Sequence, residues 1–379
     1  MFPKKIKVGI ITMHKVLNAG SALQAWALYR KVEQLGYSCE MIDYQYPNHF
    51  HLSHRQHLGT KQSFIAQFIA RLKFFVLYRT RVQRLRFATF WRSAWKSSAT
   101  TYTTPESLQQ DPPMYDIYMV GSDQVWNPEF MYGDTSYFCT FAGNKPRISY
   151  ASSFANADIP TELYQTYKES LLSFSSISVR EEGGRNLVQK LTGKDAMVVC
   201  DPTLLLTKSD YEPLITQSEI KIKKPYLLAY ILSYAYNPYP TIHKVIEQIS
   251  KKRNLPVIYL LANSIDDYHL GNSITNAGPN EFLHLIAEAE CIVTSSFHGV
   301  AFALNFEKEF YTILPKNADT SNRIYSLLKI VGALDRIILN EPTFKLPKQT
   351  TKYKEIIQKI QQYRNTSIEY LEKSLKNCV

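Results

Sequence analysis

The chain has 379 residues, of which 45% are hydrophobic, and this length and composition favour two packed domains over one. Its five cysteines are scattered without a Cys-x-x-Cys pair, which argues against a disulfide framework or a cysteine zinc site and favours a reducing compartment. The formal net charge of +11 does not indicate a nucleic-acid partner, because ten basic residues lie between Asp43 and Glu106, where no acidic residue occurs, and the rest is nearly neutral. With no visible secretory signal and no apolar run long enough for a bilayer, we expect a cytoplasmic protein.

The N-terminal half alternates apolar strands with amphipathic helices. A strand over residues 6–12, a helix over 21–36 and a second strand over 38–44 form a β-α-β unit. Further strands are predicted at residues 116–122, 147–152 and 176–180, and a strand followed by an Asp-Pro turn at 196–206, with helices at 161–172 and up to 191. We therefore expect an N-terminal α/β domain over residues 1–210.

A basic helical insertion is predicted at about residues 50–105. Apolar residues recur at three- and four-residue steps and form one helical face beside the basic one, at Phe64, Ile65, Phe68, Ile69, Leu72, Phe75 and Val76. Segment 55–96 therefore either lies on an anionic membrane, at its inner face, or packs as a helical pair on its own domain. The insertion also carries His49, His51, His54 and His57, but no carboxylate or cysteine partner accompanies them, and we expect no metal site.

The second half repeats the alternation after a polar, broken stretch at residues 207–225. Strands are predicted at 226–232, 256–261, from 291 and at 310–314, with helices at 239–254, 279–289, from 299 and from 322. This gives a C-terminal α/β domain over residues 220–350, followed by a charged helix within residues 351–379 that bridges back to the first domain. The predicted fold class is α/β, with two Rossmann-like domains facing a cleft.

Ligands of open parallel sheets bind beyond the carboxyl ends of the strands, so polar residues there are the site candidates. After the first strand, Asn18 and Gly20 precede a helix that carries Gln24, and this loop can offer backbone amides to a ligand. Ordinary helix capping by Asn18 or Ser21 is the alternative. Neither the dinucleotide nor the NTP glycine fingerprint is present.

Two further strand ends carry chemically useful groups. The motif "VGSDQVWNP" places a carboxylate, an amide and an indole together at Asp123, Gln124 and Trp126, a combination suited to binding a sugar. The alternative is a capped helix with Trp126 in the core, which has the same sequence pattern. "SVREEGG" delivers Arg180, whose planar fork grips a carboxylate or phosphate unless it pairs with its acidic neighbours.

The sequence "CIVTSSFHGVAFALN" places Ser295, Ser296 and His298 where a buried strand meets a helix N-terminus, a position that attracts anions. There His298 could neutralise or protonate a bound anion. Arg323, near the start of the next helix, supplies a second cation or caps a surface helix. We expect a positively charged cradle between the two domains.

Five motifs in order, "NAGSALQAWAL", "GSDQVWNP", "SVREEGG", "DPTLLL" and "TSSFHGVAFAL", resemble the polysaccharide pyruvyl transferase family, from about Val8 to Leu334. The resemblance implies a GT-B-like fold and an enzyme that needs no cofactor. It further implies phosphoenolpyruvate as donor and, as acceptor, a sugar of a bacterial surface polysaccharide, such as capsule or exopolysaccharide, or of its lipid-linked precursor.

The resemblance also implies residue roles. His298 matches the family's donor-site histidine and Arg180 a donor-site arginine. Many members have an arginine two residues before the histidine, where this chain has Ser296, so Arg323 becomes the substitute candidate.

The expected site has three groups of residues. The catalytic group is His298, Asp123 and Arg180; the donor-binding group adds Ser295, Ser296 and Arg323; and the acceptor-binding group is Asn18, Gly20, Gln24, Asp123, Gln124 and Trp126. The alternatives are a GT-B-type glycosyltransferase with a nucleotide-sugar donor and a noncatalytic glycan-binding protein.

Overall fold

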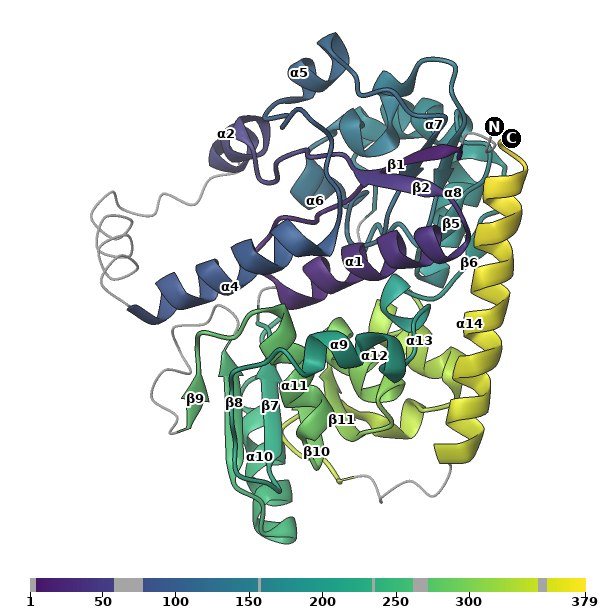
Figure 1. Ribbon diagram of the computed structural model, residues 1–379. Helices are drawn as coiled ribbons and strands as arrows, with labels where there is room; N and C mark the ends of the chain where they lie inside the picture. Colours follow the sequence, from purple (N-terminus) through teal and green to yellow (C-terminus); the bar gives the residue numbers. More distant parts are fainter. Residues whose placement is uncertain (1–4, 58–77, 156–157, 234–235, 262–271, 347–352) are drawn as a thin grey trace.

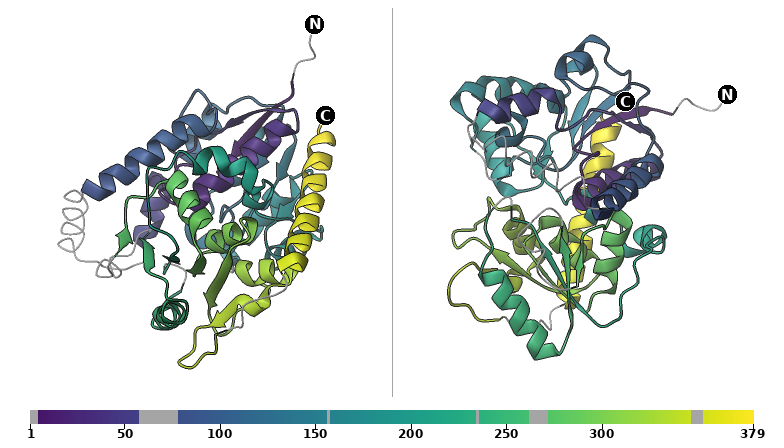
Figure 2. Two further views of the ribbon diagram at one scale, coloured as in Figure 1. Left: turned by 60° about the horizontal axis from the view of Figure 1, so that its bottom comes forward. Right: turned by 90° about the vertical axis from the view of Figure 1, so that its left-hand side faces the viewer.

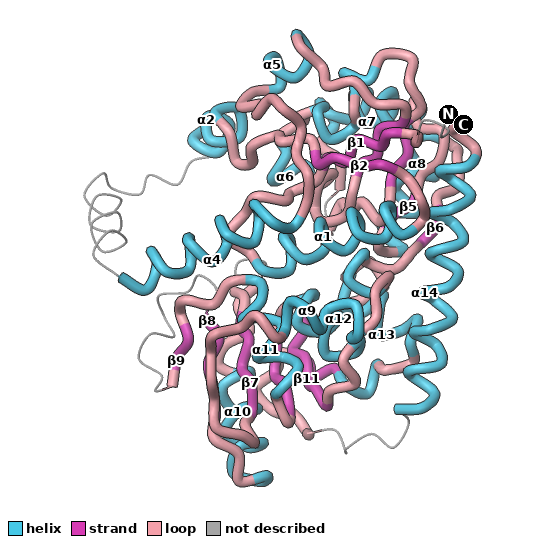
Figure 3. Tube along the Cα trace, in the orientation of Figure 1, coloured by secondary structure: helices cyan, strands magenta, loops and turns pink. Residues whose placement is uncertain are grey.

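The structure, a computed structural model, describes residues 5–57, 78–155, 158–233, 236–261, 272–346 and 353–379. The described chain forms two main sheets, one in each half of the sequence, with helices packed around them (Figure 1). Figure 2 shows the two halves stacked on each other, and Figure 3 shows strands inside each half with helices outside. This is the predicted α/β architecture.

The N-terminal sheet has the strand order β2-β1-β3-β4, and all its pairs are parallel. Its strands are β1 (Lys7–Ile11), β2 (Ser38–Met41), β3 (Ile117–Val120) and β4 (Arg147–Ser149). Every residue of β3 is buried, because helices cover both faces of a parallel sheet. Single bridges continue the sheet toward a parallel pair, β5 (Ser178–Val179) and β6 (Met197–Val198).

The C-terminal sheet has six parallel strands in the order β12-β11-β10-β7-β8-β9. They are β7 (Leu227–Ile231), β8 (Val257–Leu261), β9 (Ser273–Ile274), β10 (Cys291–Thr294), β11 (Glu309–Leu314) and β12 (Ile337–Leu339). The order reverses direction around β7 and β10, the switch point at which parallel sheets bind ligands. The loop after β10 carries His298.

Thirteen named helices belong to the described residues. In the first half they are α1 (Ala19–Gln34), α2 (His49–His57), α4 (Tyr78–Ala94), α5 (Pro105–Gln110), α6 (Pro128–Met131), α7 (Tyr164–Leu172) and α8 (Glu182–Thr192). In the second half they are α9 (Lys208–Ile215), α10 (Thr241–Arg253), α11 (Pro279–Glu288), α12 (Phe297–Asn305), α13 (Arg323–Val331) and α14 (Tyr353–Lys376). Short 3₁₀ turns lie at Thr135–Phe138, Thr140–Ala142, Thr161–Leu163, Pro202–Leu204 and Leu334–Arg336.

The stretch predicted as a broken polar linker contains α9. Its N-terminus is capped by reciprocal hydrogen bonds between Thr207 and Asp210, and Tyr211 is buried against the rings of Trp26 and Phe302. The same hydrophobic cluster includes residues of α1 and α11, so the two halves share a core.

The last helix, α14, runs along both halves, as the yellow helix of Figure 1 shows. Ser367 accepts a hydrogen bond from the backbone N–H of Cys200 at 2.9 Å. The Arg364 guanidinium donates to the carbonyl of Leu204 at 2.5 Å and to Oδ1 of Asn305 at 3.0 Å. These contacts are the predicted bridge back to the first half.

The apolar face predicted for the basic insertion, residues 64–76, lies outside the described residues. The described helix α4 buries Phe87 and Phe90, and its Arg86 donates to the carbonyl of Asn276 at 2.9 Å and lies 3.3 Å from Glu281. This part of the insertion therefore packs on its own protein. Within the described ranges, no helix combines the length and the apolar character needed to span a bilayer.

Candidate active site

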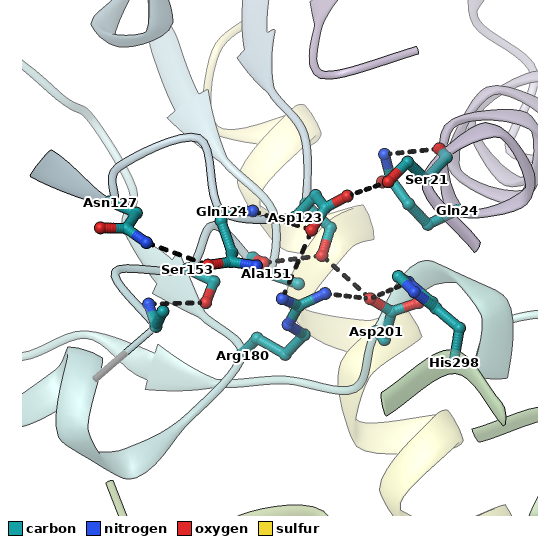
Figure 4. Close-up of polar contacts among 12 residues, drawn as sticks. Ser21, Gln24, Asp123, Gln124, Asn127, Ala151, Ser153, Arg180, Asp201 and His298 are labelled. Atoms are coloured by element: carbon teal, nitrogen blue, oxygen red, sulfur yellow. Dashed lines mark hydrogen bonds and ion pairs between the residues drawn. The ribbon is translucent and has the colours of Figure 1, made fainter. Parts of the chain in front are cut away.

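Arg180 follows β5 directly and reaches the seam between the two halves (Figure 4). The residue is 3% exposed, and its Nη1 donates to Oδ2 of Asp201 at 2.9 Å. Its Nη2 lies 3.8 Å from Asp123, and its guanidinium carbon lies 4.5 Å from the centre of the Phe297 ring. Within the described part of the chain, Nε and Nη2 make no hydrogen bond, although Nε lies 3.9 Å from Oε2 of Glu181.

Asp201, which the sequence reasoning did not assign to the site, is the centre of this cluster. Its Oδ1 caps the following turn through the N–H and hydroxyl of Thr203, and its Oδ2 also accepts from Ser122 at 3.1 Å. Burial would raise the pKa of Asp201, but the His298 side chain and the Arg180 charge outweigh burial and hold that pKa well below its usual range. The carboxylate therefore stays ionised while it holds Arg180.

His298 comes from the other half of the chain, in the first turn of α12, and its Nε2 lies 3.8 Å from Oδ2 of Asp201. The residue is 8% exposed. The ring packs against Gly20, where an added Cβ would lie 2.2 Å from Nδ1. Gly20 therefore serves as the close-packing surface for the histidine, since any larger residue would collide with the ring.

Asp123 lies on the N-terminal side of the seam with a left-handed backbone, φ +73°. Its carboxylate accepts hydrogen bonds from the Ser21 hydroxyl at 2.5 Å and from the backbone N–H of Gln124 at 2.9 Å. Burial would raise the pKa of Asp123, but the charges of Arg180 and His298 lower it overall. The residue is thus an ionised acceptor that α1 and β3 hold in place together.

Arg323 is the second cation of the site. The Gln124 carboxamide lies between Asn127 and Arg323; with its oxygen toward the guanidinium, it accepts from Nη1 at 2.9 Å and from Nη2 at 3.2 Å. The Arg323 guanidinium also lies 5.8 Å from the centre of the Phe297 ring, so one aromatic ring lies near both site arginines.

Glu181, one of the acidic neighbours predicted beside Arg180 at this strand end, adds a third carboxyl group behind the guanidinium. Its Oε1 accepts from the hydroxyl of Ser153 at 3.0 Å and the N–H of Phe154 at 3.1 Å. Burial raises the pKa of Glu181, and within the described residues its Oε2 has no hydrogen-bond donor. Three carboxyl groups thus lie around Arg180, because a guanidinium this deeply buried requires counterions, and the predicted positively charged cradle stays a prediction.

Trp126 does not lie where its predicted sugar-binding role requires. Its ring is fully buried, its indole N–H donates to the carbonyl of Tyr137 at 2.9 Å, and Phe138 stacks on one face. The prediction of Trp126 as a sugar platform is therefore wrong, because both its ring and its N–H are used by the core of the first half.

Several other predicted residues have structural partners. Ser295 donates to the carbonyl of Leu232 and accepts from its N–H, both at 2.8 Å, which joins the ends of β10 and β7. Ser296 caps α12 through the N–H of Gly299, and Asn18 caps α1 through the N–H of Ser21. Their predicted ligand contacts stay predictions.

Gln24 donates to the hydroxyl of Thr12 and to the carbonyl of Ser21. Its Oε1 has no donor within the described residues, so one acceptor is left in the predicted acceptor region. A hollow of about 200 Å³ lies between α8 and Ser321, with Gly183 and Asn186 in its wall, and none of the predicted site residues lines it.

A family model described as polysaccharide pyruvyl transferase matches residues 18–317, a span that includes Asp123, Arg180, Asp201 and His298 but ends before Arg323. The chain belongs to the polysaccharide pyruvyl transferase family. The predicted family membership is thus confirmed. No protein among the curated sequences matches this chain.

Solved structures match this family member over nearly its whole length. The Staphylococcus aureus MnaA–UDP co-structure has a TM-score of 0.50 at 11% identity, covering 94% of this chain and 86% of that one. The UDP-GlcNAc 2-epimerase of Methanocaldococcus jannaschii has a TM-score of 0.49 at 12% identity, covering 95% and 99%. The glycotransferase of kitacinnamycin has a TM-score of 0.49 at 11% identity, covering 98% and 100%. The predicted GT-B-like fold is confirmed.

Proposed function

We propose that this family member transfers pyruvate from phosphoenolpyruvate onto two hydroxyls of one sugar of a bacterial surface polysaccharide, such as a capsule or its lipid-linked precursor. One observation carries the proposal. Arg180 lies within ion-pair distance of Asp123 and Asp201, and His298, which comes from the second half of the chain, lies beside the same Asp201 carboxylate. The sugar, the donor and the ketal chemistry are parts of this proposal.

The chemistry needs a proton, two cations and a base. A proton adds to the methylene carbon of the donor, the first sugar hydroxyl attacks the adjacent carbon and loses its proton, and the second hydroxyl displaces phosphate. One hydroxyl proton replaces the proton spent on the methylene group and the other leaves with phosphate, so the products are the ketal and inorganic phosphate.

Each residue type suits one of these needs. The Nε and Nη2 groups of Arg180, together with Arg323, would hold the donor's carboxylate and phosphate. We assign His298 to donate the proton or contact the phosphate, and Asp123 to accept the hydroxyl proton or bind the sugar. Asp201 touches no proposed substrate atom and is a positioning residue for Arg180 and His298.

Asp123, Arg180 and His298 are almost fully buried, so a substrate must part the two halves or displace side chains at the seam. Gly20 and His298 would then separate on opening and close over the bound donor.

The test is incubation with phosphoenolpyruvate and candidate surface glycans, followed by mass spectrometry for a pyruvate ketal and by a phosphate-release assay. We expect the ketal mass gain to require both His298 and Arg180. Unchanged phosphate release in His298→Ala and Arg180→Ala would disprove the assignment, and retained glycan binding without turnover would favour a noncatalytic glycan-binding protein.

The main alternative is a GT-B-type glycosyltransferase, because one similar solved structure is a complex with UDP. Thermal-shift titration separates the two: a ligand that binds the folded chain raises the unfolding temperature with concentration. We expect phosphoenolpyruvate, and neither UDP- nor GDP-sugars, to do so.

We also propose that segment 55–96 brings the enzyme to the inner face of the membrane. The exposed basic residues of α4, such as Arg81 and Arg92, support it, whereas the buried Phe87 and Phe90 favour packing alone. Flotation with anionic liposomes decides: salt-sensitive binding is expected, and its absence would leave the segment a packing role.

A further inference from the structure

A second hollow of about 480 Å³ lies on the N-terminal half, away from the Arg180 cluster. We call it the Trp91 hollow, defined by its lining residues Lys15, Ala88, Trp91, Arg92, Trp95 and Ser97. Four of these residues belong to α4 or follow it directly, and Lys15 belongs to the loop between β1 and α1. None of them has a role in the proposed reaction.

The Trp91 hollow lies at the carboxyl edge of the N-terminal sheet. Lys15 follows β1 and its ammonium group contacts Asp43, just beyond β2, at 2.7 Å, while Ser97 bridges to Met41, the last residue of β2. Ligands of parallel sheets bind at this edge. The loop that carries Lys15 continues to Asn18, the cap of α1, and so connects the hollow to the active-site helix.

Two tryptophans with unsatisfied N–H groups line this hollow. Trp91 is half-buried and Trp95 is buried, and within the described residues neither indole nitrogen has a hydrogen-bond acceptor. The core residue Trp126, by contrast, donates to the carbonyl of Tyr137. Because buried indole N–H groups usually find a partner, these two are candidates for an oxygen-rich ligand whose apolar face packs on the ring.

The charges of the hollow favour an anionic group on that ligand. Burial would raise the pKa of Asp43, but His14, Lys15 and Thr101 hold it well below its usual range, so Asp43 stays ionised and offsets the Lys15 charge. Arg92 is exposed, and within the described part of the chain no carboxylate lies within ion-pair distance of it. The lining thus carries one uncompensated cation beside two aromatic rings.

We propose that the Trp91 hollow is a saccharide subsite that holds a sugar of the acceptor glycan together with an adjoining phosphate or carboxylate. This inference rests on the proposed function, since it supplies the acceptor of the same enzyme. A sugar ring packs on Trp91, a turn of the indole rings brings their buried N–H groups to its hydroxyls, and the anionic group contacts Arg92 and Lys15. The subsite anchors a part of the glycan that is not itself modified.

The experiment uses the full chain and an array of hexose and N-acetylhexosamine disaccharides in neutral, uronic-acid and phosphorylated forms. Binding is followed by tryptophan fluorescence and calorimetry. We expect Trp91→Ala to weaken binding by about tenfold, the loss of a stacking contact with its hydrogen bond. Arg92→Gln should weaken only the anionic members, and the uronic-acid and phosphorylated arms identify which anion is bound.

Arg81→Gln is the matched control, because Arg81 is an exposed arginine of the same helix that does not line the hollow. Arg92→Gln changes an exposed side chain, so it keeps the test decisive even where Trp91→Ala fails to fold. The proposal is overturned if wild-type protein binds no array member at millimolar concentration, or if both variants bind as the wild type does.

The outcome also separates this inference from the proposed function. Pyruvyl transfer that is insensitive to Trp91→Ala and Arg92→Gln would leave the function standing and remove the subsite. Glycan binding that depends on Trp91, without phosphate release from phosphoenolpyruvate, would keep the subsite and remove the function.

Discussion

Asp201 shows how one residue can serve the local fold and the site together. One carboxylate oxygen caps the turn at Thr203, and the other faces Arg180 and His298. The motif "DPT" predicted only the turn. Asp201 follows β6, the parallel neighbour of the strand that precedes Arg180, and neighbouring parallel strands end at the same edge of a sheet. This neighbourhood was the sequence signal that could have placed Asp201 in the site.

Asp201→Asn is expected to lower kcat/KM for phosphate release by roughly 100-fold, because it removes the nearest charged partner of the buried Arg180 guanidinium. Steady-state kinetics measure it, and the positioning role predicts a changed pH–rate profile in addition to a lower rate. Glu182→Gln is the control, as that carboxylate pairs only with Arg185 in the described structure. Equal losses in both variants would contradict the role of Asp201.

Gly20→Ala is expected to destabilise the protein by about 1–3 kcal/mol, because its new Cβ would lie 2.2 Å from the His298 ring. Chemical denaturation measures the free energy of unfolding. In the His298→Ala background the same substitution should cost much less, since the colliding ring is gone. A cost independent of His298 would show that the two residues do not touch across the seam.

At the scale of elements, strand ends were easier to predict than the roles of their side chains. Buried parallel strands read as apolar runs, so β1, β3, β7 and β10 stand out in the sequence. Trp126 was placed on the correct strand end but with the wrong role, because a tryptophan that packs a core and one that holds a sugar look the same in sequence. Only the packing of Phe138 on its ring distinguishes them.

The helix α14 should contribute measurably to stability through Arg364. Arg364→Ala removes hydrogen bonds to Leu204 and Asn305 and is expected to lower the free energy of unfolding by about 2–3 kcal/mol. Urea denaturation checks this against Gln361→Ala, an exposed position on the same helix. Equal midpoints for the two variants would mean that α14 does not tie the halves together.

At the scale of the whole molecule, the buried carboxylates between the two halves should make the free energy of unfolding depend on pH. The pKa values of Asp123 and Asp201 are lowered in the folded state, so both groups stabilise it above their unfolded pKa of about 3.9, and this contribution is lost as pH falls. Glu181, whose pKa is raised, acts in the opposite direction.

We therefore expect the free energy of unfolding to fall as pH drops below about 4, with a smaller slope in Asp201→Asn. Denaturant titrations between about pH 2.5 and 6 measure both slopes. An unchanged slope in the variant would contradict the lowered pKa of Asp201.

The sequence by itself determined the alternation of strands and helices, the family motifs and the strand ends that carry Asp123, Arg180 and His298. Hydrophobic periodicity and turn residues are local properties, so they can be read along the chain. The tertiary structure alone decided that Gly20 touches His298, that Asp201 joins Arg180 to His298, and that three carboxyl groups surround Arg180. Those facts depend on how two separately wound sheets dock, and the charges that a buried guanidinium collects come from segments far apart in sequence.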